Sequence, residues 1–108
     1  MSDTDFDRRL QELFENFRRQ LPERLRTILA SWNLYLESGQ TDALEELRFH
    51  THKLAGAAST YGYTEIGEIA RQIETRLDDF IGKGEHDEIK RELQPHIDHI
   101  EELIKAAN

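Results

Sequence analysis

The stretch that decides the fold reads Phe49-His50-Thr51-His52-Lys53-Leu54-Ala55-Gly56-Ala57-Ala58-Ser59-Thr60-Tyr61-Gly62. In and just before it, one set of residues recurs at steps of three and four, which is the spacing of one face of an α-helix. These residues are Leu44, Leu47, Thr51, Leu54, Ala58 and Tyr61. The stretch is therefore predicted to form the middle and end of a helix that buries this face, with Gly62 as its terminator.

His52 lies off the buried face, because neighbouring helical residues are about 100° apart and Thr51 is on that face. On the C-terminal half of its own side, the helical neighbours of His52 are Ala55, Gly56 and Ser59, all of them small. A glycine inside a helix costs roughly 1 kcal/mol relative to alanine, so Gly56 needs an explanation. Either another helix of the chain packs closely there, or Gly56 removes bulk beside the imidazole so that a reacting partner can reach the ring.

The charge pattern sets the same stretch apart. The chain has 22 acidic residues, but the 18 residues from 47 to 64 contain none of them. This window holds two basic residues and two histidines, namely Arg48, Lys53, His50 and His52. An acidic chain thus keeps one neutral-to-basic patch, which suits a partner or ligand that brings negative charge, such as a phosphoryl group.

The pattern His52-x-Leu54-x-Gly56-x-Ala58-x-x-x-Gly62 resembles the signature of histidine phosphotransfer (HPt) domains. The resemblance continues into Ala70-x-x-Ile73-Glu74, which is similar to the next helix of that family. The motif spans residues 52–74. Many members carry lysine three residues after the histidine. This chain has Ala55 there, and its nearest lysine is Lys53.

The resemblance implies that His52 projects to solvent from the second helix of a bundle and accepts a phosphoryl group. The predicted phosphate- or partner-binding residues are Arg48, Phe49, Lys53, Ala55, Gly56 and Ser59. Arg48 and Lys53 could steer the partner, hold phosphoryl oxygens or simply be solvated. Phe49 could anchor a partner, since aromatic side chains dominate many interfaces, or pack in the core.

Length and composition bound the remaining choices. A chain of 108 residues without cysteine is expected to be one domain, residues 1–108. The net charge of −8 argues against nucleic-acid binding by phosphate neutralisation and against a polybasic membrane surface. No apolar run approaches the length of a membrane span, and the acidic N-terminus is not that of a signal peptide. We therefore expect a cytoplasmic protein.

Helical periodicity covers most of the chain. The first apolar series runs from Leu10 to Leu36 and stays in phase through Pro22, so it predicts one kinked helix or two collinear ones. Gly39 is predicted to cap its end. Further helices are predicted after an N-terminal cap at Asp42, over the apolar series from Ile66 to Phe80, and from Ile89 to Ile104 with a kink at Pro95.

Four amphipathic helices with short connections predict an all-α fold. The expected architecture is an antiparallel, up-down-up-down four-helix bundle, and the start of the chain forms an additional N-terminal helix or helical extension. The resemblance to HPt domains implies the same bundle.

The predicted function is that of a phosphocarrier in a His–Asp phosphorelay. A neutral imidazole can attack the acyl phosphate of an aspartate, provided the group is positioned in line and its charge is neutralised. The expected partners are receiver domains of response regulators or hybrid kinases. No nucleotide-binding motif is present, so we expect no kinase activity. We also expect no cofactor, with Mg²⁺ on the receiver instead, and a monomer.

Two alternatives compete with this reading. A non-catalytic adaptor could bind a partner helix in a groove at Gly56. A metal site in the bundle would usually need Glu-x-x-His pairs, whereas Glu46 with His50 and Glu92 with His96 are each four residues apart, so no metal site is predicted. His50 lies roughly 200° round the helix from His52 and cannot share its role. The remaining histidines, His86, His96 and His99, are predicted to be surface or packing residues.

Overall fold

The computed structural model describes residues 3–108, so Met1 and Ser2 of the predicted domain lie outside the described residues. Four α-helices make up most of this range, and no strand occurs in it. They are α1 (Asp3–Ser38), α2 (Thr41–Thr60), α3 (Thr64–Phe80) and α4 (His86–Ala106). The prediction of an all-α fold is confirmed.

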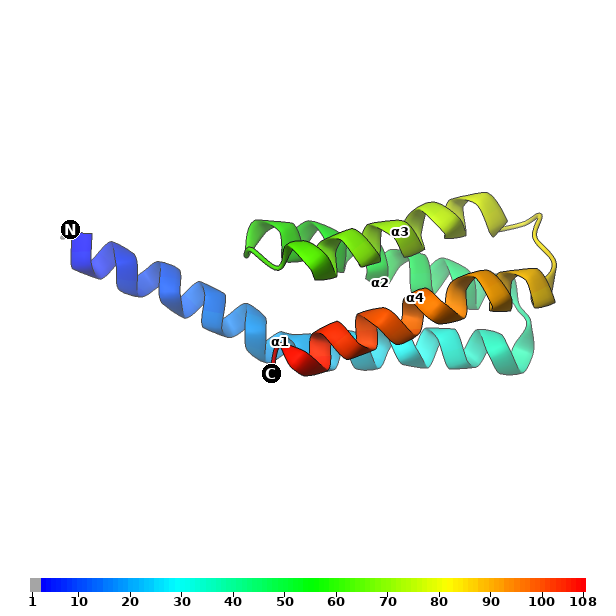
Figure 1. Ribbon diagram of the computed structural model, residues 1–108, viewed down its shortest axis with the longest axis horizontal. Coiled ribbons are helices and arrows are strands. Elements are labelled where there is room, and N and C mark those ends of the chain that lie inside the picture. Colours follow the sequence, from blue (N-terminus) through cyan, green and yellow to red (C-terminus); the bar gives the residue numbers. More distant parts are fainter. Residues whose placement is uncertain (1–2) are drawn as a thin grey trace.

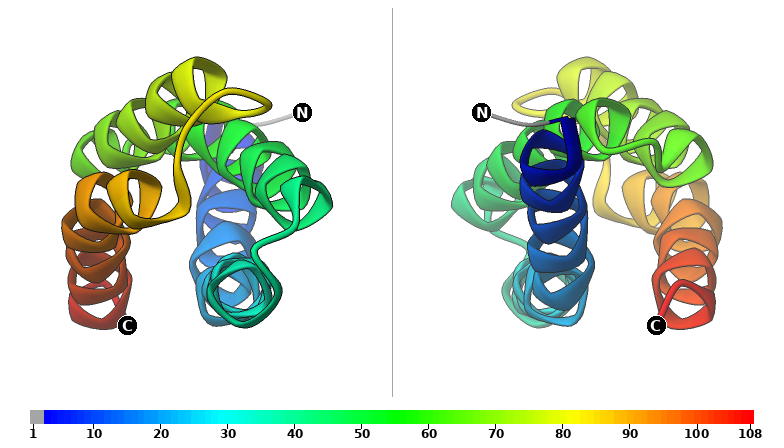
Figure 2. Two further views of the ribbon diagram at one scale, coloured as in Figure 1. Left: turned by 90° about the vertical axis from the view of Figure 1, so that its right-hand side faces the viewer. Right: turned by 90° about the vertical axis from the view of Figure 1, so that its left-hand side faces the viewer.

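Successive helices reverse direction at short turns, as Figure 1 shows. Seen along the bundle, the four helices lie round a common centre (Figure 2). α1 packs against α2 and α4, α3 packs against the same two helices, and across residues 3–108 neither α1 and α3 nor α2 and α4 are packed together. This is the connectivity of an up-down-up-down bundle, in which sequence neighbours are also spatial neighbours.

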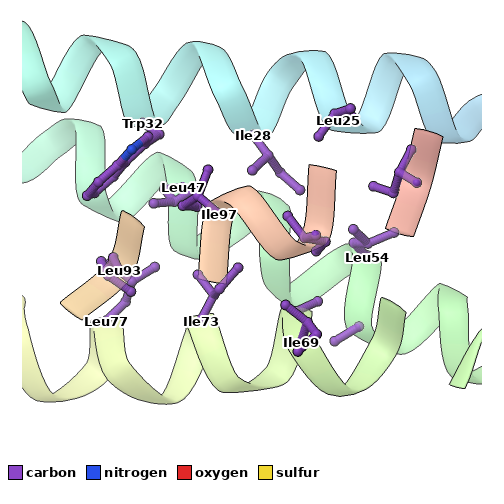
Figure 3. Close-up of a cluster of buried hydrophobic side chains, with 14 of the residues drawn as sticks. Leu25, Ile28, Trp32, Leu47, Leu54, Ile69, Ile73, Leu77, Leu93 and Ile97 are labelled. Carbon is purple, nitrogen blue, oxygen red and sulfur yellow. The ribbon is translucent and has the colours of Figure 1, made fainter. Parts of the chain in front are cut away.

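The core takes side chains from all four helices (Figure 3). Ile28, Leu47, Ile73 and Leu93 are almost completely buried and represent α1 to α4 in turn. Burying one such side chain stabilises the fold by roughly 1.5–3 kcal/mol. Trp32 lies in the same cluster, and its indole Nε1 donates a hydrogen bond to Gln94 Oε1 at 2.8 Å, so its polar atom is satisfied.

The turns follow the glycine pattern. Gly39 has a φ of 68°, and its N–H donates to the Tyr35 carbonyl at 2.7 Å, which confirms the predicted cap. Gly62, with a φ of 83°, follows α2 as predicted. Such positive φ values favour glycine. The prediction that Asp42 caps α2 is wrong, because the helix begins one residue earlier and Gln40 occupies the N-cap position.

α1 is one helix that contains Pro22 in its interior, so the alternative of two separate helices is excluded. Pro22 has no N–H to donate to the carbonyl four residues earlier, and this missing bond favours a bend. The ribbon of α1 does bend midway (Figure 1), and its N-terminal half runs past the ends of the other helices. The predicted N-terminal helical extension is therefore present. Like α1, α4 is continuous through its proline, Pro95.

The apolar series of α1 is buried only within the bundle. Phe17 and Leu21 are almost fully buried. The preceding members of the series, Leu10, Leu13 and Phe14, are between 38% and 49% exposed, and Phe6, which comes before the series, is 55% exposed. None of the helices within residues 3–108 combines the length and apolar character needed to traverse a bilayer.

Candidate functional site

His52 lies in the middle of α2, and 69% of its side chain is exposed. The outward orientation follows from its neighbours. Thr51 and Leu54 are fully buried and fix the inner face of the helix, so His52 is turned towards the solvent. Thr51 can occupy the core because its hydroxyl donates to the Arg48 carbonyl at 3.1 Å. The ring is therefore open to an approaching molecule.

Glu74 on α3 holds the imidazole from one side. Its two carboxylate oxygens lie 2.9 and 3.0 Å from His52 Nδ1. Only 19% of the Glu74 side chain is exposed, because the flanking Ile73 and Leu77 are buried and seat this part of α3 on the core. A half-buried carboxylate on a packed helix fixes the ring more firmly than a mobile surface residue would.

The hydrogen bond also assigns the tautomer of the neutral ring. A carboxylate accepts hydrogen bonds, so Nδ1 is the ring nitrogen that carries the hydrogen, and it donates a hydrogen bond to Glu74. The lone pair of the neutral ring is then on Nε2, the nitrogen that makes no contact with Glu74. His52 thus presents a nucleophilic nitrogen from an exposed ring whose other nitrogen is occupied.

Gly56, one turn after His52, opens onto empty space. A Cβ atom added there would meet no atom within 4 Å outside the local helix backbone. The explanation by close packing of another helix is therefore wrong for Gly56. That role belongs to Gly67 on α3, where an added Cβ would lie 3.0 Å from Ser59 Oγ and 3.5 Å from the Ala55 carbonyl oxygen. Gly56 leaves the approach to His52 clear.

The basic residues of the window lie at different edges of α2. Arg48 forms an ion pair with Asp78 of α3, and the hydrogen bond to this carboxylate raises the pKa of the Arg48 guanidinium. Lys53 places its Nζ 5.1 Å from the centre of the Phe49 ring, as a cation–π pair. Lys53 and His50 line a groove against α1 instead, on the side away from Glu74.

The window of residues 47–64 contains no acidic residue, but in the folded chain acidic side chains of α3 lie against it. α3 packs along α2 and brings Glu74 to His52 and Asp78 to Arg48. The neutral-to-basic patch predicted from the chain order is thus partly neutralised by the next helix. A one-dimensional count of charges misses this, because residues 74 and 78 lie well outside the window.

The other predicted site residues fall into two groups. Phe49 is 56% exposed, which excludes the alternative that it packs in the core. Ser59 is exposed, and its hydroxyl donates to the Ala55 carbonyl at 2.9 Å. Ala55 is different, because it is only 4% exposed and belongs to the core, so its inclusion among partner-binding residues is wrong on geometric grounds.

Sequence reasoning missed two residues of α3 that contact α2, Glu74 at His52 and Arg71 at Ser59. Glu74 was part of the quoted motif, but only the fold brings it to the ring. Arg71 of α3 donates from its guanidinium to Ser59 Oγ at 3.4 Å, and no sequence signal links it to His52, 19 positions away. Its position follows solely from the antiparallel packing of α2 and α3.

The structure gives no support to the metal-site alternative. Within residues 3–108 there is no group of three or more acidic, histidine or cysteine side chains arranged to hold a metal ion. Glu92 accepts a hydrogen bond from Arg76 at 3.2 Å, and His96 is half-buried, where burial lowers its pKa. These residues are better described as part of the packing between α3 and α4.

Comparison with known proteins agrees with this geometry. The family model described as "Hpt domain" matches residues 12–108. No curated protein and no solved structure matched the chain. The match covers nearly the whole sequence and includes the helix that carries His52 and the helix that carries Glu74. The chain therefore belongs to the Hpt domain family, the histidine phosphotransfer domains.

Proposed function

We propose that this chain carries phosphoryl groups on His52 between receiver domains of a His–Asp phosphorelay. Hpt domains as a family perform histidine phosphotransfer and interact with receiver domains, without kinase activity of their own. One observation supports His52 as the acceptor above all others. Its ring is largely exposed while Nδ1 lies 2.9 Å from a Glu74 oxygen, which leaves Nε2 as the nucleophile.

The transfer step balances with the groups at hand. The Nε2 lone pair attacks the phosphorus of an aspartyl phosphate on the receiver and forms an N–P bond. The P–O bond to the aspartate breaks, and its electron pair stays on the departing carboxylate. The proton on Nδ1 remains in the hydrogen bond to Glu74, whose negative charge balances the positive charge that develops on the ring. The same step in reverse passes the phosphoryl group to a second receiver.

The rest of the machinery is assigned to the partner. Phosphoryl transfer depends on alignment and charge neutralisation, and we assign the Mg²⁺ to the receiver domain, whose aspartate holds the phosphoryl group. On this chain, Gly56 provides clearance and Phe49 provides an exposed aromatic contact for docking. Arg48, Lys53 and Ser59 lie on the same helix and would border the docked receiver. The carrier acts as a single copy in the cytoplasm.

The test is transfer from a phosphorylated receiver domain, followed by radiolabel or intact mass. The wild-type chain should gain one acid-labile, base-stable phosphate. His52→Gln should abolish labelling, and His50→Gln, the matched control two residues away, should retain it. Loss of labelling in His50→Gln together with labelling of His52→Gln would refute the proposal. An adaptor that only binds a partner helix would acquire no such phosphate at all.

A further inference from the structure

A phosphoryl group on His52 brings about two negative charges next to Glu74, and a nearby cation would be needed to offset them. The two basic side chains of α2 nearest to His52, Arg48 and Lys53, already have other partners. The guanidinium of Arg48 is paired with Asp78. Lys53 lies over the Phe49 ring and lines the groove against α1, whereas His52 meets α3. The lysine that many Hpt domains have at the position of Ala55 is missing from this chain.

Arg71 is the basic side chain of α3 that meets α2 at Ser59, on the C-terminal side of His52. It precedes Glu74 by three residues, so the two side chains share one face of α3, with Cβ atoms about 5–6 Å apart. Unlike Arg48 and Arg76, it forms no ion pair within the part of the chain that the structure describes. Its single hydrogen bond, to Ser59, is long at 3.4 Å and exposed, and is therefore weak.

The lean of the Arg71 side chain shows where else it can reach. Ser59 follows His52 by seven positions, which is about 10.5 Å along α2. Arg71 precedes Glu74 by three positions, which is only about 4.5 Å along α3. Because His52 meets Glu74, the guanidinium must lean away from His52 to reach Ser59. Leaning back would carry it over Gly56, where an added Cβ would meet no atom of another helix within 4 Å.

We propose that Arg71 binds the phosphoryl group on His52 Nε2, in the space above Gly56, and takes the part that the missing lysine would play. This inference rests on the proposed function, because it concerns the phosphorylated form of the same site. A guanidinium can donate two parallel hydrogen bonds to phosphoryl oxygens, which suits it to this role. Arg71 exchanges the weak hydrogen bond to Ser59 for charge-assisted hydrogen bonds to the phosphoryl group. Gly56 and Arg71 are then two parts of one phosphoryl-binding site.

The test uses phosphoramidate as a small phosphoryl donor, so that receiver docking does not enter the measurement. Arg71→Gln should lower the rate of His52 labelling about tenfold or more, and Arg71→Lys should recover part of it. Arg76→Gln is the matched control, because it removes the same charge from an arginine of the same helix that pairs with Glu92. The control should stay within about twofold of wild type.

A second measurement reports contact directly. The side-chain Nε–H signal of Arg71 in ¹H–¹⁵N spectra should shift when the wild-type chain is phosphorylated, and should not shift when His52→Gln receives the same treatment. If wild type is labelled but Arg71→Gln reacts as fast as Arg76→Gln and the signal stays in place, the inference about Arg71 is overturned while the proposed function stands. If wild type is labelled by neither phosphoramidate nor a phosphorylated receiver, the proposed function fails as well.

Discussion

α2 carries a histidine at each of its two long edges. At the edge facing α3, His52 donates to the Glu74 carboxylate, Gly56 leaves open space, and Arg71 of α3 donates to Ser59. At the edge facing α1, His50 is half-buried in a groove that Lys53 also lines, and its ring lies 5.5 Å from that of Phe49. Only Thr51 separates the two histidines in the chain. The position on α2 exposes the ring of His52, and the adjoining helix α3 orients it through Glu74.

The largest effect should come from filling the open space beside His52. Gly56→Leu would put a branched side chain one turn from the ring and keep the donor from lining up with Nε2. Since displacement of a reacting group by about 1 Å can cost about 100-fold, labelling by a phosphorylated receiver should fall by at least about 100-fold. Unchanged labelling would show that the clearance at Gly56 is irrelevant.

The matching substitution, Gly56→Ala, separates access from helix stability. An added Cβ meets nothing within 4 Å, so the methyl group fits. The free energy of unfolding, from urea denaturation, should rise by about 1 kcal/mol because alanine is the better helix former. Labelling should fall much less than in Gly56→Leu. A loss of stability would contradict the open space described here.

The next largest effect should come from Glu74, whose carboxylate binds His52 and has no counterpart at His50 within residues 3–108. Glu74→Ala removes the acceptor that keeps the proton on Nδ1 and orients the ring, and loss of a hydrogen bond of this charged type corresponds to about a tenfold slower reaction. Glu74→Gln keeps an acceptor oxygen and should lose less. Labelling rates with phosphoramidate measure both, and equal rates for wild type and Glu74→Ala would remove Glu74 from the mechanism.

A smaller effect is expected at Phe49, which would act on docking only. Phe49→Ala should weaken binding to a receiver by about five- to tenfold, since it truncates an exposed aromatic side chain. Labelling by phosphoramidate should be unchanged, because this small donor needs no docking surface. Titration calorimetry gives the affinity. Slower phosphoramidate labelling would instead place Phe49 in the chemical step.

The smallest effect is expected for Lys53→Ala. Its cation–π contact with Phe49 is exposed and contributes about 0.5–1 kcal/mol at most. Binding to a receiver should weaken by no more than about fivefold, and the difference should shrink at high salt because exposed charges are screened. A tenfold loss of affinity would indicate that Lys53 contacts the phosphoryl group and that both edges of α2 help to bind it.

Much of the fold could be predicted from sequence, because the apolar periods of the four helices and the glycines at their ends are local signals. Trp32 and Leu54 are buried where the periodicity put them. Periodicity does not show where a bundle ends, however. Leu10 and Leu13 keep step with the buried series of α1 and are exposed all the same, because the other helices do not extend that far.

The site was predictable only in part, for a physical reason. Helical spacing put His52 off the buried face of α2, whereas for Gly56 it left open whether another helix packs there or the space is free. The partners of the ring come from α3, whose rotation relative to α2 is set by packing at positions such as Gly67. Sequence spacing alone therefore singled out His52 as the candidate acceptor, but not Glu74 and Arg71, and it included the buried Ala55.

The burial of its side chains also divides α1 into two parts that should open independently. The turns before Phe17 bury few side chains, whereas Phe17 and Leu21 lie in the core, so fraying of those first turns removes almost nothing from the core. Amide protons near Phe6 should exchange with deuterium through local opening, while those near Ile28 should exchange only on global unfolding. The first turns of the chain can therefore unwind and re-form without disturbing the platform that presents His52.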